Sequence, residues 1–352
     1  MRCKACGQLF NLQTGTLSDL ESLRDANITP ALRRVAIRCA AAWPYRQAQQ
    51  SIVDFTGVSI SHEQIRQLCS DEAKKVHAKH EVVFQQAYSK SLVETVEILV
   101  EYISSLPWPE PILPPAIDES QRVYFGIDGT FINAKEAKQF FEAKAAIVFT
   151  NDIAIVGKNR RMLLNKQYVG TLESVDVFSE KLFTTAQAMG IGNQHELVIL
   201  SDGARWITKL AKTQYPKATL ILDWWHLDER VWETVDWLKL NGLQPKTARE
   251  FGHRLIELLW RGKGKEALQS IVTLGKHLGL EPPAKRSQAE LGERSLQTLY
   301  QYIKNNIDAV IDYHTFKRAG YYIGLVVAEK TIDLLVCRRQ KLRGQNWSRE
   351  GA

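Results

Sequence analysis

Three aspartates stand where apolar segments of the sequence end. Asp128 lies in "GIDGTF", Asp202 follows the apolar run of "HELVILSDG", and Asp223 closes "TLILD". Side chains at strand ends of an open sheet face a common crevice, and carboxylates that meet there repel unless a cation lies between them. Hard oxygen ligands favour Mg²⁺ or Mn²⁺, and two such ions about 4 Å apart can activate a water or a 3′-hydroxyl in phosphoryl transfer. The alternative is that Asp-Gly merely marks turns.

The stretch "TLILDWWHLDERVWE" (219–233) joins an apolar strand to a charged, helix-like run. A strand that ends in the carboxylate of Asp223 and the imidazole of His226 can deliver both side chains to a site. A hydrogen-bonded structural histidine is the alternative for His226. Trp224 and Trp225 favour packing, with a stacking platform for a flipped base as the other possibility.

The elements around these residues predict an α/β fold with the order β-β-β-α-β-α-β. The expected strands cover 122–132, 143–150, 165–172, 195–203 and 218–226, and the expected helices cover 174–190 and 204–215. Residues 227–318 predict a helical insertion without a strand. Residues 319–352 predict one more buried helix over 321–342 and a basic tail.

Residues 28–105 predict an all-α region. Thr29 is an expected N-cap with Pro30 in the first turn, Gly57 closes a second helix, and Ser61 with Gln64 forms a capping-box pattern. Two helices joined by a short turn are typical of a DNA-binding helix-turn-helix, although an ordinary helical hairpin has the same layout. The recognition helix would begin with His62, Glu63, Gln64, Arg66 and Gln67.

Two further segments complete the expected domain organisation. Residues 1–27 contain Cys3-x-x-Cys6, half of a zinc knuckle, but no second pair follows at a usable spacing for a four-ligand site. Residues 106–121 form a proline-rich linker, because proline lacks the donor that helices and sheets need. The linker separates the helical region from a catalytic core expected over 122–226.

Charge and composition favour a nucleic-acid partner without demonstrating one. Lys and Arg number 46 against 39 Asp and Glu, a net charge of +7. A basic cluster near the C-terminus, which could contact phosphates or form a solvated helix face, comprises Arg338, Arg339, Lys341 and Arg343. No apolar run is long enough for a membrane span, the first residues lack a secretory signal, and five scattered cysteines do not indicate a disulfide framework. We therefore expect an intracellular, cytoplasmic protein.

These blocks together resemble a known family. The motifs "GIDGTF", "SDGARW" and "ILDWWH", with the closing block "RAGYYIGLVVAEKTIDLLVCRRQKLRGQNWSREGA", are similar to those of bacterial insertion-sequence DDE transposases of the Kra group, allied to the Mutator-like superfamily. The resemblance covers roughly residues 20–352. It implies a ribonuclease H-like catalytic domain with a helical insertion, a bacterial nucleoid-associated location, double-stranded DNA as partner and a homo-oligomer.

The resemblance also implies roles for particular residues. Asp128, Asp202 and Glu329 match the three catalytic acids, which would hold two Mg²⁺ or Mn²⁺ ions. Asp223 and His226 match the element that the superfamily places after the fifth strand, a cysteine or aspartate followed three residues later by histidine, in which His226 would position the scissile phosphate or transfer a proton rather than bind metal.

The sequence departs from the family before Glu329. The family has a Gly-Ser-Gly run there, whereas this chain reads Gly324-Leu-Val-Val-Ala328. The chain also starts at half a zinc knuckle and stops where family members continue. Two alternatives to a working transposase therefore stay open. One is a truncated or catalytically impaired copy that only binds DNA. The other is a structure-selective nuclease, which the long helical insertion disfavours.

Overall fold

The computed structural model describes residues 28–90, 117–135, 139–158, 160–279, 295–342 and 345–352, with isolated positions between 94 and 101. It forms two compact units, Met1–Ala78 and Lys79–Ala352, which divide within a helix. Cys3, Cys6, Arg343 and most of the proline-rich stretch lie outside the described residues.

The first unit contains α1 (Pro30–Ala42), α2 (Tyr45–Thr56) and the beginning of α3 (His62–Tyr88). The Thr29 hydroxyl accepts from the Leu32 N–H at 3.2 Å, and Gly57 ends α2 with a φ of 67°. The Ser61 hydroxyl accepts from the Gln64 N–H at 3.1 Å, and the Gln64 amide oxygen accepts from the Ser61 N–H at 3.1 Å. The predicted caps and the capping box are confirmed. A small core holds the helices together: Ala36, Ala40, Ala48, Ile52, Ile60 and Ile65.

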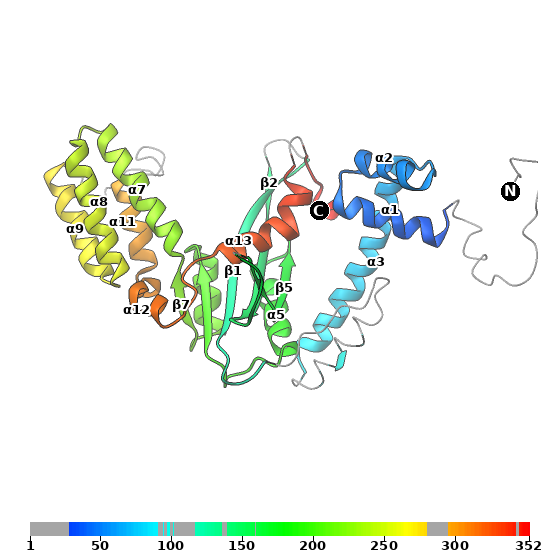
Figure 1. Cartoon of the computed structure of the whole chain (residues 1–352), viewed down its shortest axis with the longest axis horizontal. Helices are drawn as coiled ribbons and strands as arrows, with labels where there is room; N and C mark the ends of the chain where they lie inside the picture. The colour runs from blue at the N-terminus through cyan, green and yellow to red at the C-terminus, as the bar shows by residue number, and fades with distance from the viewer. Residues whose placement is uncertain are drawn as a thin grey trace, which may run out of the picture. The chain divides into compact units, whose positions relative to one another are not determined.

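A mixed five-stranded sheet is the centre of the second unit (Figure 1). Its members are β1 (Val123–Asn133), β2 (Phe140–Thr150), β5 (Lys166–Thr171), β6 (Leu197–Ser201) and β7 (Thr219–Leu222). The strands lie in the order β5-β2-β1-β6-β7, antiparallel from β5 to β1 and parallel from β1 to β7. The predicted α/β class and all five of its strands are confirmed.

A second, two-stranded sheet was not predicted. β3 (Ile153–Gly157) and β4 (Arg160–Leu163) form an antiparallel hairpin between β2 and β5. The stretch "IAIVG" lacks a polar alternation, which hid its strand character in the sequence. β3 itself carries exposed apolar residues, with Ile155 78% exposed.

The two faces of the large sheet have different covers, because successive side chains of a strand point to opposite sides. Phe125 and Ile127 pack with α5 (Val175–Ala188) and α6 (Arg205–Gln214). Tyr124 packs with residues of the later helices on the other face. The sheet is therefore the middle layer of the second unit.

The chain then leaves the sheet through α7 (Trp224–Leu240) and builds a helical block (Figure 1). The block contains α8 (Pro245–Trp260), α9 (Gly264–His277), α11 (Leu296–Asn305) and α12 (Tyr313–Arg318). Within the described part of residues 227–318 there is no strand, as predicted.

The last helical segment returns to the sheet and is shorter than predicted. α13 (Val326–Ile332) contacts β1 and β2, and a π-helical turn (Asp333–Cys337) leads into α14 (Arg338–Gln340). The predicted helix over 321–342 is wrong for its first turn. The Ile323 carbonyl accepts from the Trp224 N–H at 3.0 Å, so this stretch bonds to the start of α7 instead of forming its own turn.

Candidate active site

Asp223 is the junction between β7 and α7. The strand ends at Leu222, and Asp223 caps the helix by accepting from the Trp225 N–H at 3.2 Å. The predicted strand over 218–226 is therefore wrong beyond Leu222. An aspartate at an N-cap satisfies a free backbone donor and favours the positive end of the helix dipole, so residues 224–226 form the first helical turn.

The carboxylate of Asp223 is fully buried and has donors on both oxygens. Oδ1 also accepts from the Leu325 N–H at 3.2 Å, and Oδ2 accepts from Nδ1 of His226. The Asp223 side chain thereby connects the end of β7 to the first turn of α7 and to the backbone just before α13. This arrangement fits a positioning residue.

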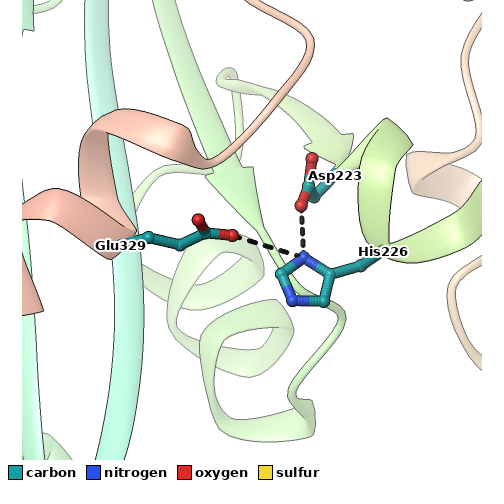
Figure 2. Close-up of side chains that lie close together, drawn as sticks. All are labelled: Asp223, His226 and Glu329. Carbon is teal, nitrogen blue, oxygen red and sulfur yellow. Dashed lines mark hydrogen bonds and ion pairs between the residues drawn. The ribbon is translucent and has the colours of Figure 1, made fainter. Parts of the chain in front are cut away.

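His226 carries a positive charge at neutral pH. The hydrogen bond to Asp223 raises the pKa of His226 to about 9, against the lowering effect of burial, and the charges of Asp223, Glu329 and Asp202 add to the rise. Nδ1 of His226 also lies 3.9 Å from Oε1 of Glu329. Figure 2 shows both carboxylates directed at the same nitrogen of the imidazole, with its other nitrogen directed away from them.

Glu329 reaches this place because α13 lies close against the sheet. A Cβ placed on Gly126 of β1 would lie only 3.1 Å from Cβ of Ala328. The Glu329 N–H donates to the Leu325 carbonyl at 2.9 Å, which continues the helix from its first residue. The Glu329 side chain is half exposed.

Asp128 lies in β1, partly buried, beside these groups. Burial, together with the negative charges of Asp202 and Glu329, raises its pKa to about 6, against the lowering effects of the Gly129 N–H and the charge of His226. The Gly129 N–H donates to Oδ1 of Asp128 at 2.7 Å. Three acids from segments far apart in the sequence are therefore coupled electrostatically.

Asp202 follows β6 and opens a turn before α6. Its Oδ1 accepts from the Ala204 N–H at 2.9 Å, and Gly203 has a φ of 90°, a conformation that favours glycine. The hydroxyl of Tyr302 donates to the Asp202 carbonyl at 2.7 Å. Tyr302 belongs to α11, so the helical block supports this acid directly, a contact for which the sequence carried no signal.

Two sets of side chains could hold a cation. Among the described residues, Asp223, His226 and Glu329 are the group whose ligand atoms all lie within 4.8 Å of one another. Asp223 already accepts hydrogen bonds on both oxygens, one of them from His226, so this trio forms a hydrogen-bonded network. Asp128, Asp202 and Glu329 supply the carboxylate oxygens that Mg²⁺ prefers.

The basic residues singled out near the C-terminus have defined neighbours. Arg338 lies 3.1 Å from Asp333, and Arg339 stacks on the Trp347 ring at 4.7 Å. Nζ of Lys341 donates to Thr130 Oγ1 at 2.8 Å, two residues along β1 from Asp128. Of these cations, Lys341 is the one that contacts β1, the strand that carries Asp128.

The candidate DNA-contacting residues of the first unit lie at the exposed start of α3. His62, Gln64, Arg66 and Gln67 are all exposed. Arg66 is held by Glu63, with an N–O distance of 2.6 Å.

The fold and site define an α/β protein with an acidic centre at the carboxyl end of parallel strands. No protein-family model and no curated protein matches this chain. Among the described residues, no helix combines the length and apolar character needed to cross a bilayer.

Proposed function

We propose that this chain is a DDE-type DNA transposase that cuts element ends and joins strands. The observation that carries the proposal is the electrostatic coupling of Asp128 to Asp202 and Glu329: burial raises the pKa of Asp128 to about 6, and the charges of the other two acids contribute to the rise. Residues that a fold collects from β1, the end of β6 and α13 against electrostatic repulsion are candidates for a functional role.

The sheet supports a ribonuclease H-like core. Three antiparallel strands, β1, β2 and β5, are followed by parallel β6 and β7 on the other side of β1. Asp128 on central β1 and Asp202 after adjacent β6 then share one edge, which is where ligands bind in open α/β sheets.

The donor set fits Mg²⁺ or Mn²⁺. The charges of Asp202 and Glu329 act on the partly buried Asp128, and such like charges repel unless a cation lies between them. These three carboxylates offer the hard oxygen ligands that Mg²⁺ and Mn²⁺ prefer. When bound, two such ions would polarise the phosphate and lower the pKa of the attacking water or 3′-hydroxyl.

The chain's own residues account for the remaining tasks. The imidazolium of His226, oriented by Asp223, would donate a hydrogen bond to a phosphate oxygen or a proton to the leaving group. Lys341 would neutralise a phosphate beside β1. The exposed start of α3 would bind DNA as part of a helix-turn-helix, in a cytoplasmic homo-oligomer that holds two element ends.

The packing of α13 favours a working enzyme over a copy that only binds DNA. In place of the family's glycines, Ala328 makes the close approach to Gly126, and Val326 projects outward with 61% exposure. The substituted segment thus leaves Glu329 facing His226.

A strand-transfer assay tests the proposal. Labelled DNA from the ends of the element that carries the gene is incubated with a target plasmid and Mn²⁺ or Mg²⁺. We expect cut and joined products from the wild type and none from Asp202→Asn or Glu329→Gln, which keep the side-chain shape but remove a charge. Thr213→Val, on the exposed end of α6, serves as a control.

Three results would contradict the proposal in different ways. End binding without cutting in every version would leave a DNA-binding protein. Cutting without joining would indicate a nuclease. Products that persist in both Asp202→Asn and Glu329→Gln would show that these two carboxylates take no part in the reaction.

A further inference from the structure

The C-terminal segment of the chain lies beside the end of β1. The Trp347 N–H donates to the Asn133 carbonyl at 2.9 Å, and the Lys135 N–H donates to the Trp347 carbonyl at 3.0 Å. Trp347 thereby forms a parallel bridge with Ala134. This contact joins the C-terminal segment to the backbone that directly follows β1, the strand that carries Asp128.

The Trp347 side chain binds the end of the α13–α14 segment (326–340), which carries Glu329. Nε1 of the indole donates to the Gln340 carbonyl at 3.1 Å, and the Arg339 guanidinium lies 4.7 Å from the ring centroid. Gln340 is the last residue of α14, and the last carbonyls of a helix have no partner within that helix. The indole N–H therefore caps the α13–α14 segment.

The indole also belongs to a small apolar cluster between the sheet and the α13–α14 segment. The buried members of the cluster come from β1, β2 and the π-helical turn, and three partly buried side chains pack against them: Ile132, Ala143 and Val336, with Phe141, Leu172 and Trp347. Val336 is the member that comes from the α13–α14 segment. The cluster thus attaches this segment to β1 and β2.

The α13–α14 segment is held at both ends. Before its first residue, the Leu325 N–H donates to Asp223 at 3.2 Å, and at its last residue the carbonyl accepts from Trp347. Two attachments define the direction of a helical segment, whereas a single one lets it pivot. Glu329 lies between the two attachments, so the distance of its carboxylate from Asp128 depends on both.

We propose that Trp347 is a positioning residue that holds Glu329 where it can share a metal ion with Asp128. This inference rests on the proposed function and adds a residue of the C-terminal segment to it. The indole acts through the segment that it caps. Loss of the indole releases the end of that segment from β1 and lets the Glu329 carboxylate move away from Asp128.

The test measures the Mn²⁺ affinity of the full chain by electron paramagnetic resonance of the free ion. We expect Trp347→Ala to bind Mn²⁺ about 10- to 100-fold more weakly than the wild type, the range typical of residues that orient metal ligands. Trp347→Phe keeps an aromatic ring in the apolar cluster but lacks the Nε1–H donor, and its affinity should lie between the two. Should Trp347→Ala not fold, Trp347→Phe carries the test.

Two further variants separate positioning from a general loss of stability. Trp237→Ala removes another partly buried tryptophan, in α7, and should lower the melting temperature with unchanged Mn²⁺ affinity. The double variant Trp347→Ala with Glu329→Gln should bind Mn²⁺ as Glu329→Gln alone does, because Trp347 acts through Glu329. In the strand-transfer assay, raising the Mn²⁺ concentration should restore cutting by Trp347→Phe.

The outcomes distinguish the positioning role from the enzyme. Unchanged Mn²⁺ affinity in both Trp347 variants, in a protein whose wild type binds Mn²⁺ and cuts element ends, overturns the positioning role and leaves the transposase intact. So does an equal loss of affinity with and without Glu329→Gln. Wild-type protein that binds no Mn²⁺ overturns the inference, and if it also cuts no element ends, the proposed function fails with it.

Discussion

Ala328 lies against Gly126, so that a Cβ on the glycine would be 3.1 Å from the alanine Cβ. This contact joins α13, which carries Glu329, to the strand that carries Asp128. The distance between the first and third acids therefore depends on two small residues that are about 200 positions apart in the sequence.

We predict that Gly126→Ala lowers the free energy of unfolding by about 1–3 kcal/mol and activity by about tenfold. The new methyl would meet both Ala328 and Ile147 and push α13 off the sheet. Urea unfolding and the strand-transfer assay measure the two effects. Gly170→Ala is the matched control, since its Cβ would meet Leu335 at an ordinary 3.5 Å. Equal free energies of unfolding and equal activities in Gly126→Ala and Gly170→Ala would contradict a role for the close packing of Ala328 on Gly126.

Asp223→Asn should return the His226 pKa from about 9 toward 6.5, because the carboxylate hydrogen bond is the largest cause of the rise. A raised histidine pKa stabilises the fold fully below pH 6.5, and this stabilisation is lost as the pH rises through 9. With solvent screening of the half-exposed ring, we expect about 1–2 kcal/mol. NMR titration of labelled histidine and urea unfolding from pH 6 to 9.5 measure it. A His226 that titrates near 6.5 in the wild type would contradict the prediction.

Divalent ions should stabilise the protein more at pH 8 than at pH 5. The raised pKa of Asp128 means that the native state binds an extra proton, so stability falls by roughly 2–3 kcal/mol as the pH rises from about 4 through 6. A bound cation offsets this loss only once Asp128 is ionised. Thermal melts with Mg²⁺ or Mn²⁺ at both pH values measure it. At pH 8 without divalent ions, Asp128→Asn should have a higher melting temperature than the wild type. Added Mg²⁺ or Mn²⁺ should no longer raise the melting temperature of this variant.

Tyr302→Phe should weaken the support of Asp202 from the helical block. The variant loses the hydrogen bond to the Asp202 carbonyl, which contributes about 0.5–1.5 kcal/mol, and leaves that carbonyl without this donor. We expect a several-fold lower rate of DNA cleavage with unchanged end binding. Tyr300→Phe on the same helix is the control. A Tyr302→Phe variant that cleaves DNA as fast as Tyr300→Phe would show that the bond is structural only.

Arg66→Ala should weaken DNA binding uniformly across sequences and reduce the slope of log affinity against log salt by about 1. Glu63 holds Arg66 in the free protein, so Glu63→Gln should bind DNA at least as well as the wild type. Fluorescence anisotropy at several salt concentrations measures both. An unchanged salt slope in Arg66→Ala would place α3 away from the DNA backbone.

The sequence predicted those features that local patterns determine. Ser61 with Gln64 defined a helix start, and alternating or continuous apolar runs defined the five strands of the large sheet. Asp223 was assigned to a strand end, although an aspartate before a charged run is also an N-cap signal. Because two apolar tryptophans follow Asp223, the strand was predicted to continue beyond Leu222, and the N-cap at Asp223 was not recognised.

Long-range contacts were beyond prediction. The bond from Tyr302 to Asp202 and the fit of Ala328 on Gly126 depend on how α11 and α13 return to the sheet. Trp224 is buried and Trp225 is exposed because they lie on different sides of helix α7. The sequence analysis had placed both residues in a strand and so could not predict these positions. Hydrophobic periodicity in the sequence identifies a helix or a strand, but it does not identify the segment against which that helix or strand packs.

The wide spacing of the three acids has a consequence for synthesis in the cell. Glu329 is translated 201 residues after Asp128, which takes about 10–40 s at roughly 5–20 residues per second. During that time a growing chain can form β1 and its neighbours but lacks the last carboxylate and the α13 packing that completes the centre. A protein built this way has its complete acidic centre only after Glu329 and α13 have been translated.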